Sequence, residues 1–401
     1  MKGFHHALSI SEHIQTFPRT YKEDQGYRVD DSEPCERSEN IIFHADGLKW
    51  HVKVTSKAKI GITKRAGLLK RRKKLEALIS LIDFHSISLL PDTVSEIVIE
   101  KVSCLLCLPK LPLKQEFQLD YTEPSDTCWV YTIQEDASRV LYPIYDIESK
   151  LPMIALADIE EKEQISNNVF LVTSKGRDEN LIYKTVEHPF YEQNHTAVFQ
   201  QELRNLVLLQ GCRNIVQLVA VVTSPSPFQT KPSSGSVDVI LGMVLEYYPN
   251  GTLEDAIHLL NGKGTAWKTW PCHLAHALLR LHNTCITHMD ITSRNVVIDA
   301  ADEPVFIDIG VGYTYENLAP EFRNDFPPLE LSFNQRCQND WWAFGKLLIE
   351  LASIEDNGSS GTIIRNIGEK LSCEHPEDRL DISEAIRILP TSKKLIYRNI
   401  I

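Results

Sequence analysis

The sequence lacks the features that would point to a membrane or to nucleic acid. No stretch of its 401 residues approaches the roughly 20 apolar residues of a spanning helix, and the N-terminus, MKGFHHALSIS, has no apolar signal-peptide core. The 54 acidic residues outnumber the 42 basic ones, and a net charge of −12 disfavours nucleic-acid binding because phosphate contacts need a basic face. We therefore expect no membrane or nucleic-acid partner, and a cytoplasmic or nuclear location.

The nine cysteines also lack the pairing that a disulfide framework or a zinc site requires. Their number is odd and they are scattered through the chain, so reduced thiols are expected. Cys104 and Cys107 form one CxxC inside VSCLLCLP, without the second Cys or His pair that tetrahedral zinc needs. Buried structural thiols are the favoured interpretation of this pair.

The chain length favours two domains, and 43% apolar with 24% charged residues is enough for a sizeable core. Residues 17–40 are polar and are predicted to form a loop or a disordered segment. LKWHVKV (48–54) alternates as a strand does, as do parts of 94–108, 128–134 and 140–146, while 64–82 continues a basic run into an amphipathic helix. The basic run could be a nuclear-import patch, although a solvated helix face is favoured. We expect residues 1–155 to be an N-terminal region of mixed structure, partly disordered and without an assigned function.

From about residue 160 the pattern changes from strands to helices. QIS-NN-VFLVTS predicts a hairpin with a two-residue turn, and LIYKTV is the next strand. TAVFQQELRNLVLLQ (196–210) has apolar residues at helical spacing, and two buried strands follow it. Predicted helices then dominate, in TLEDAIHLL, CHLAHALLRLH and DWWAFGKLLIELAS. The sequence therefore predicts an α+β protein with a small β-rich lobe followed by a larger helical lobe.

The chemistry is concentrated in HMDITSRN (288–295) and FIDIG (306–310). These segments carry Asp290, Asn295 and Asp308, with eighteen residues from the first Asp to the second. Two carboxylates and an amide on neighbouring loops could hold Mg²⁺ and orient a hydroxyl for phosphoryl transfer. They could equally be ordinary turn residues, so the remaining motifs have to decide.

Five motifs follow one another in the order LIYKTV with Lys184, FQQELRNL with Glu202, EYYPNGTL, HMDITSRN and FIDIG. This order resembles that of the eukaryotic protein kinases, and it favours the phosphoryl-transfer interpretation over ordinary turns. The resemblance implies that Lys184 contacts the α- and β-phosphates of ATP and pairs with Glu202. It implies that Asp290 accepts the proton of the substrate hydroxyl, that Asn295 and Asp308 hold Mg²⁺, and that Arg294 belongs to the catalytic loop.

The same resemblance implies an adenine site at the hinge and a phosphate-covering turn before it. The hinge residues would be Leu245, Glu246, Tyr247 and Tyr248, with Glu254 or Asp255 reaching the ribose. The covering turn would use Ile165, Ser166, Asn167 and Asn168, where the family has glycines that let backbone N–H groups approach the phosphates.

One further position departs from the pattern, and others complete it. Met289 stands where the family has an Arg that binds an activation-segment phosphate, so switching by that phosphate is not expected. Asp340 would anchor the catalytic loop, and Arg379 would pair with the Glu that ends the activation segment. Glu321 in LAPEF spells that motif better, but Glu330 in PPLEL gives the more usual spacing to Asp340, and we predict Glu330.

We therefore predict an ATP- and Mg²⁺-dependent protein kinase acting on a protein hydroxyl, of Ser or Thr as the commoner class, with residues 156–398 as the kinase-like domain. A pseudokinase that binds nucleotide or serves as a scaffold is the first alternative, because the loop glycines are missing. A small-molecule phosphotransferase of the aminoglycoside or choline kinase type is the second, because it shares an HxDxxxxN loop.

Overall fold

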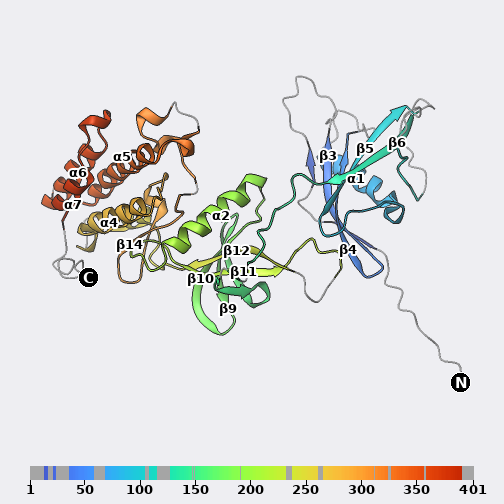
Figure 1. Ribbon diagram of the computed structural model, residues 1–401, viewed down its shortest axis with the longest axis horizontal. Helices are drawn as coiled ribbons and strands as arrows, with labels where there is room; N and C mark the ends of the chain where they lie inside the picture. Colours follow the sequence, from blue (N-terminus) through green and yellow to red (C-terminus); the bar gives the residue numbers. More distant parts are fainter. Residues whose placement is uncertain are drawn as a thin grey trace. The chain divides into compact units, whose positions relative to one another are not determined.

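The structure, a computed structural model, forms two units that are described separately (Figure 1). Unit 1 comprises Met1–Arg139 with Pro225–Asp238, and unit 2 comprises Val140–Ser224 with Val239–Ile401. The residues that the structure describes are 13–16, 21–23, 36–57, 68–103, 108–114, 127–146, 148, 150–189, 191–231, 237–260, 265–310, 312–323, 327–355 and 358–390.

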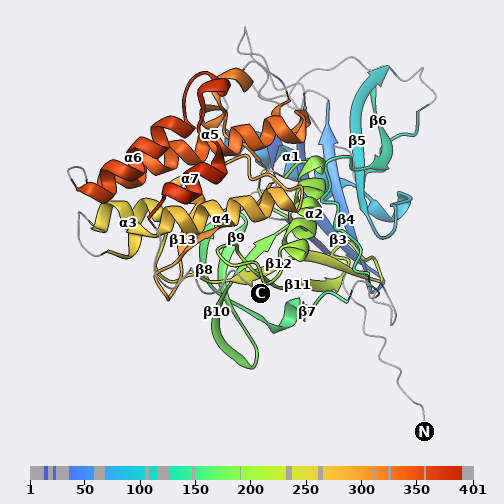
Figure 2. The same ribbon diagram turned by 60° about the vertical axis from the view of Figure 1, so that its left-hand side comes forward.

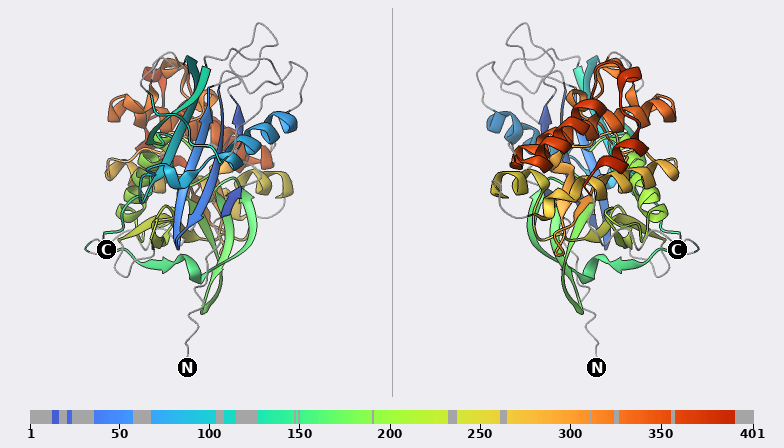
Figure 3. Two further views of the ribbon diagram at one scale, coloured as in Figure 1. Left: turned by 90° about the vertical axis from the view of Figure 1, so that its right-hand side faces the viewer. Right: turned by 90° about the vertical axis from the view of Figure 1, so that its left-hand side faces the viewer.

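Unit 1 is a six-stranded sheet with one helix packed on it (Figure 3). The helix, α1 (Leu68–Leu81), crosses between two parallel neighbours, β4 and β5, and its buried Leu75, Leu78 and Ile79 share one apolar core with the sheet. The strands are β1 (His13–Thr16), β3 (Arg37–Ala45), β4 (Leu48–Ser56), β5 (Val94–Ser103) and β6 (Thr127–Glu135) in sheet order, with β2 (Lys22–Glu23) paired to β3.

A two-residue turn fixes the register of β3 against β4. Asp46 and Gly47 both have positive φ, +52° and +76°, which is the backbone of the type I′ hairpin that an Asp-Gly pair favours. Val52 and Val54 then face the α1 side of the sheet, whereas Lys53 faces the other side and contacts Asp136 at 2.9 Å. The period-two alternation of the sequence is therefore realised as one apolar and one polar face.

Unit 1 includes an insert from a distant part of the chain, residues 225–238. Thr230 is buried there: its backbone N–H donates to Asp92 at 2.9 Å, and its hydroxyl accepts from the Asp92 N–H at 2.8 Å. The backbone N–H of Lys49 donates to the Thr230 carbonyl at 2.9 Å, and the Phe228 ring lies edge-on to His51 at 5.2 Å. The Ser- and Pro-rich composition of this segment favours a surface loop, so its contacts with Asp92 and Lys49 do not follow from the local sequence.

Unit 2 begins with a second six-stranded sheet and a helix, α2 (Gln193–Leu208). The hairpin expected at Asn167–Asn168 is present, and it joins the two strands at one edge of the sheet. In sheet order the strands are β7 (Met153–Ala155), β11 (Leu218–Pro225), β12 (Asp238–Glu246), β10 (Arg177–Thr185), β9 (Val169–Ser174) and β8 (Ile159–Ser166).

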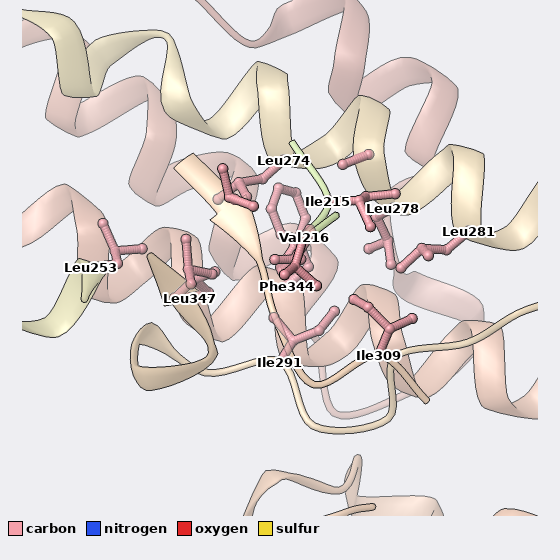
Figure 4. Close-up of a cluster of buried hydrophobic side chains, with 14 of the residues drawn as sticks. Ile215, Val216, Leu253, Leu274, Leu278, Leu281, Ile291, Ile309, Phe344 and Leu347 are labelled. Atoms are coloured by element: carbon pink, nitrogen blue, oxygen red, sulfur yellow. The ribbon is translucent and has the colours of Figure 1, made fainter. Parts of the chain in front are cut away.

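The rest of unit 2 is helical (Figure 2), which confirms the expected two-lobed α+β fold. Phe344 lies in the core of this part, among Leu274, Leu278 and Leu347 (Figure 4). Gly345 and Gly368 bring two helices close, because a Cβ on Gly345 would lie 2.8 Å from the Gly368 carbonyl. The elements are α3 (Leu253–Leu260), α4 (Trp270–Asn283), α5 (Phe333–Ala352), α6 (Ser359–Leu371) and α7 (Ile382–Ile388), with a short hairpin of β13 (Val296–Ile298) and β14 (Pro304–Phe306).

Several local expectations change. The predicted strand at 140–146 is wrong, because the chain there makes only an isolated bridge, Ile144 with Val239. The basic residues of α1 are partly neutralised: Arg71 contacts Glu23 at 2.6 Å and Arg72 contacts Glu39 at 3.0 Å, which weakens the nuclear-import interpretation. Cys104, Cys107 and most of the polar segment 17–40 lie outside the described residues.

Candidate active site

The ammonium of Lys184 lies between two carboxylates. It is 2.8 Å from Glu202 on α2 and 2.7 Å from Asp308, which follows β14. The alternation of β10 turns Lys184 away from Tyr183, which packs in a small apolar cluster on the other face of the sheet. Glu202 is 3% exposed and Asp308 is 46% exposed, so the charged trio runs from the interior of the lobe towards solvent.

Neighbouring charges keep two members of this trio, the Lys184 ammonium and the Asp308 carboxylate, in their ionised forms. Burial alone would lower the pKa of the Lys184 ammonium, but the two carboxylates outweigh it and the pKa is raised above its usual value. The same ammonium lowers the pKa of Asp308. Burial raises the pKa of Glu202, because the attraction of a shared Lys184 only partly offsets the loss of solvent. The site therefore presents a fixed cation beside a half-exposed anion, as a phosphate–metal site needs.

The side chain of Asp290 is oriented by three N–H donors. Asn295 donates to its Oδ2 at 3.1 Å and to its backbone carbonyl at 2.8 Å. Its other carboxylate oxygen, Oδ1, accepts from the backbone N–H of Thr314 at 3.2 Å and from the side-chain amide of Asn317 at 3.1 Å. Sequence reasoning missed Thr314 and Asn317, although their position just before LAPE was the available signal. Asp290 and Asn295 are thus brought together, as the HMDITSRN spacing suggested.

Buried residues of α5 hold the loop that carries Asp290. The backbone N–H groups of His288 and Met289 donate to the two oxygens of Asp340 at 2.8 and 2.7 Å, and His282 contacts Asp340 at 2.9 Å. Asp340 is fully buried, and burial lowers the pKa of His288. Met289 is 1% exposed with φ +67°, so an apolar side chain fills a strained turn. The expected anchoring contact is therefore present.

The predicted hinge residues lie at the end of β12. Leu245 is buried, Tyr247 and Tyr248 are partly buried, and Glu246 is exposed, with its carboxylate accepting from the Tyr248 hydroxyl at 3.0 Å. Burial raises the pKa of that hydroxyl. These positions suit an adenine site, and their role remains a prediction.

The remaining predicted residues are more exposed. Asp255 accepts hydrogen bonds from Thr252, at 2.6 Å from the hydroxyl and 3.1 Å from the backbone N–H, so it already stabilises the start of α3. These hydrogen bonds lower the pKa of Asp255, and its ribose role stays a prediction, as does the alternative Glu254. Arg294 is exposed within the described loop.

The hairpin tip that stands where the family has glycines is exposed. Ile165 is 55% exposed, Ser166 and Asn167 are exposed, and the side chains on this strand edge point to solvent. The Asn168 carbonyl accepts from the Thr185 N–H at 2.9 Å, one residue beyond Lys184. Phosphate contacts from this tip stay a prediction.

The predicted end of the activation segment at Glu330 is wrong. Arg379 instead pairs with Glu321 of LAPE, at 2.6 and 2.8 Å, while Glu330 is exposed. The reason is local: Ala319 donates its N–H to buried Asn339 at 2.8 Å, and this holds the LAPE turn against α5. The segment from Asp308 to Glu321 therefore has only fourteen residues.

Phosphoryl transfer needs a fixed lysine, a carboxylate and an amide that can hold a metal, and an oriented aspartate. The site contains all four, with the carboxylate of Asp308 half exposed. Comparison with known proteins points the same way, since a family model described as the protein kinase domain matches residues 166–360. The C-terminal part of this chain is a eukaryotic protein kinase-like domain. The matched range contains Lys184, Glu202, Asp290, Asn295 and Asp308.

The relatives of this chain include several plant kinases. A serine/threonine-protein kinase-like protein of Arabidopsis thaliana is 30% identical over 129 residues, 28% of this chain and 27% of that protein. The leaf rust 10 disease-resistance locus receptor-like protein kinase-like 1.2 of Arabidopsis thaliana is 24% identical over 234 residues, 55% of this chain and 36% of its own length. The L-type lectin-domain containing receptor kinase S.7 of Oryza sativa subsp. japonica is 29% identical over 161 residues, 34% and 22% of the two chains. The chain thus matches about a third or less of each relative.

These relatives overturn the expected cytoplasmic or nuclear location. Several of them are receptor or receptor-like kinases by name, so composition alone was the wrong basis for the cytoplasmic or nuclear assignment. Among the described residues, no helix combines the length and the apolar character needed to cross a bilayer.

Proposed function

We propose that the kinase-like domain is catalytically active and transfers the γ-phosphoryl group of ATP to a protein hydroxyl. The observation that carries this proposal is the pair of contacts of Lys184, at 2.8 Å to Glu202 and 2.7 Å to Asp308. A lysine that is positioned by a buried carboxylate can place its charge on the phosphates without moving first. The residues predicted for each role all belong to unit 2.

The donor set suits Mg²⁺. Asp308 offers a carboxylate that is half exposed and held ionised, and Asn295 uses its amide nitrogen on Asp290, which leaves the amide oxygen as an oxygen ligand. Hard oxygen ligands from one or two side chains, completed by phosphate oxygens, are what this ion accepts in kinases. Asp308 and Asn295 would hold Mg²⁺, which would neutralise part of the charge that develops during phosphoryl transfer.

Asp290 takes the role of proton acceptor. Its two oxygens are held by Asn295, Asn317 and the backbone of Thr314, so the carboxylate faces one way without rotating. A substrate hydroxyl that approaches it is oriented for attack and hands over its proton as the new bond forms. We propose Ser and Thr as acceptors, supported by the name of the serine/threonine-protein kinase-like relative.

The proposed extent of this function is residues 156–398, with unit 1 and its unassigned role outside it. The match to a protein kinase model favours a protein substrate over a small molecule, which was the second alternative. The exposed, glycine-free tip at Ser166 and Asn167 favours the first alternative, a nucleotide-binding or scaffolding pseudokinase, because side chains crowd the approach to the phosphates. The full triad of Lys184, Glu202 and Asp308 outweighs this single departure.

The test is transfer of radiolabelled phosphate from ATP to a generic protein substrate by the full chain. We expect Mg²⁺-dependent incorporation by the wild type, and none by Asp290→Asn or Asp308→Asn. Phosphoamino-acid analysis of the product then distinguishes Ser and Thr from Tyr. Equal incorporation by the wild type and both variants would show a contaminating kinase, and no incorporation at millimolar MgATP would reject activity in favour of the scaffold.

A further inference from the structure

Asn205 links helix α2 to the turn that carries Asp308. It lies three residues after Glu202, is 3% exposed, and donates its amide N–H to the Ile309 carbonyl at 3.0 Å. Its own oxygen accepts from Gln201 at 2.9 Å, one helical turn earlier. The amide therefore satisfies both of its ends inside the lobe, and one end is used on the residue next to Asp308.

The turn presses against this amide so closely that only glycine fits beside it. Gly310 has φ +71°, and a Cβ there would lie 2.9 Å from the Asn205 nitrogen and 2.8 Å from the Thr287 carbonyl. Asn205 thus fills the space between α2 and the turn at Gly310, whose left-handed backbone conformation is rare for residues other than glycine. Glu202 and Asn205 lie on the same face of α2, because residues three apart are neighbours on a helix.

The described catalytic loop has no arginine at the position where the family binds an activation-segment phosphate, a contact that would help to hold α2 in place. Met289 occupies the position of the arginine that would receive an activation-segment phosphate, and it is 1% exposed. The segment from Asp308 to Glu321 has fourteen residues, and it ends in the Glu321–Arg379 pair. A contact that does not depend on phosphorylation has to hold α2 if Lys184 is to meet both carboxylates.

We infer that Asn205 is a positioning residue that locks α2 to the Asp308 turn, so that the nucleotide and metal site is assembled without a phosphorylation switch. Helix α2 then sets the distances from Lys184 to both of its carboxylate partners. It carries Glu202, which contacts Lys184 directly, and Asn205, which fixes the backbone next to Asp308. This inference rests on the proposed function, because it concerns how the same site is kept in order.

The variant Asn205→Leu removes the N–H donor and keeps the side-chain volume. We expect kcat to fall about tenfold and the Mg²⁺ concentration for half-maximal activity to rise, with KM for the protein substrate unchanged, because one buried hydrogen bond to the Asp308 turn is lost. Arg204→Leu is the matched control on the same helix, since Arg204 is exposed and contacts only Gln201 among the interactions described for it. It should change neither quantity.

Two measurements separate positioning from a merely structural role. Since Glu202 contacts Lys184 directly and Asn205 fixes the turn of Asp308, the other partner of Lys184, both act on one assembly. The double variant Glu202→Gln, Asn205→Leu should therefore lose no more activity than Glu202→Gln alone. Amide hydrogen exchange at residues 308–310 should be faster in Asn205→Leu than in the wild type or in Arg204→Leu. The inference would be overturned if Asn205→Leu lowered the melting temperature but left the Mg²⁺ dependence of activity unchanged. Additive losses of activity in the double variant would overturn it as well.

The exchange measurement also works when no phosphate is transferred. A wild type without activity, but with faster exchange in Asn205→Leu, would reject the proposed function and keep the lock. An active wild type with unchanged exchange at 308–310 would reject the lock and keep the function.

Discussion

Arg379 donates two hydrogen bonds to the carboxylate of Glu321, at 2.6 and 2.8 Å. Arg379 is 7% exposed and Glu321 is 23% exposed, so removing the acid leaves a largely buried guanidinium without its partner. We expect Glu321→Ala to lower the free energy of unfolding by about 3 kcal/mol, at the low end for a buried pair because the acid is partly hydrated.

Glu330→Ala is the control for this pair, since Glu330 is exposed and should change the stability by less than about 0.5 kcal/mol. Urea denaturation of both variants, followed by circular dichroism, makes the comparison. Equal losses, or a larger loss for Glu330→Ala, would contradict the assignment of the segment end to LAPE.

Gly242 allows β12 to approach the strand that carries Lys184. It pairs with Thr185, and a Cβ there would clash with the Lys184 carbonyl and lie 2.5 Å from the Tyr183 ring. Gly242→Ala should therefore destabilise the protein by about 1–3 kcal/mol through overpacking. Gly312→Ala is the control, because a Cβ at Gly312 would meet nothing within 4 Å and the φ of Gly312 is not positive. Thermal melts of the two variants should differ clearly in midpoint, and similar midpoints would contradict this account.

The order of motifs was enough to predict the lobes and the pairing of Lys184 with Glu202, but not the contact of Lys184 with Asp308. Lys184 and Glu202 lie on a periodic strand and a periodic helix, where periodicity fixes which side chains share a face, whereas Asp308 lies in the turn after β14. The Glu321 pairing could not be predicted from spacing, because it depends on Asn339 holding the Ala319 backbone. The usual length of an activation segment favours Glu330, whereas the contact of Asn339 with Ala319 ends this segment earlier, at Glu321.

Two polar contacts lay outside the reach of the sequence for another reason. Asn205 occupies a buried place on an amphipathic helix, where an apolar residue is the ordinary choice, and its partner is 104 positions away. Thr230 lies in a Ser- and Pro-rich stretch that usually means a surface loop, yet Asp92 holds it at a separation of 138 positions. Long-range pairs of this kind follow from the fold and not from local propensity.

The stability of unit 1 should depend on His51. Burial, with a smaller effect of nearby Lys49, lowers the pKa of His51 from 6.5 to about 4, so the folded state favours the neutral ring. The contribution is fully present above pH 6.5, since the ring is neutral in both states, and it is lost as the pH falls towards 4. The full loss is about 3 kcal/mol, which follows from the difference between the two pKa values.

Urea denaturation at pH 7 and at pH 4.5 measures this contribution. His51→Gln cannot gain the proton, so its stability should fall less between the two pH values than that of the wild type. His44 is a second histidine with a lowered pKa, and His44→Gln serves to separate its share. An equal fall in the free energy of unfolding between pH 7 and pH 4.5 for the wild type and His51→Gln would show that His51 is protonated equally in the folded and unfolded states.

Binding of MgATP should be visible as stabilisation of the full chain. Lys184 supplies a fixed charge for the phosphates, and Asp308 and Asn295 supply oxygen ligands for the metal. The glycine-free tip at Ser166 and Asn167 withdraws part of the phosphate contact, so affinity should be lower than in a kinase with loop glycines, yet measurable. At about 100 times its dissociation constant a ligand stabilises the folded state by about 2.7 kcal/mol, which is enough for a clear thermal shift.

The variants assign this shift to residues. The wild type should shift most with ATP and Mg²⁺ together and less with ATP alone, whereas Asp308→Asn should lose the difference that the metal makes. Lys184→Met should lose most of the shift in either condition, because the phosphates no longer face a cation. Asp290→Asn should keep the wild-type shift while losing phosphate transfer, since its contacts are to Asn295, Asn317 and Thr314 and its role is with the hydroxyl. A wild type that does not shift at millimolar MgATP would contradict the nucleotide site itself, whatever its kinase-like fold.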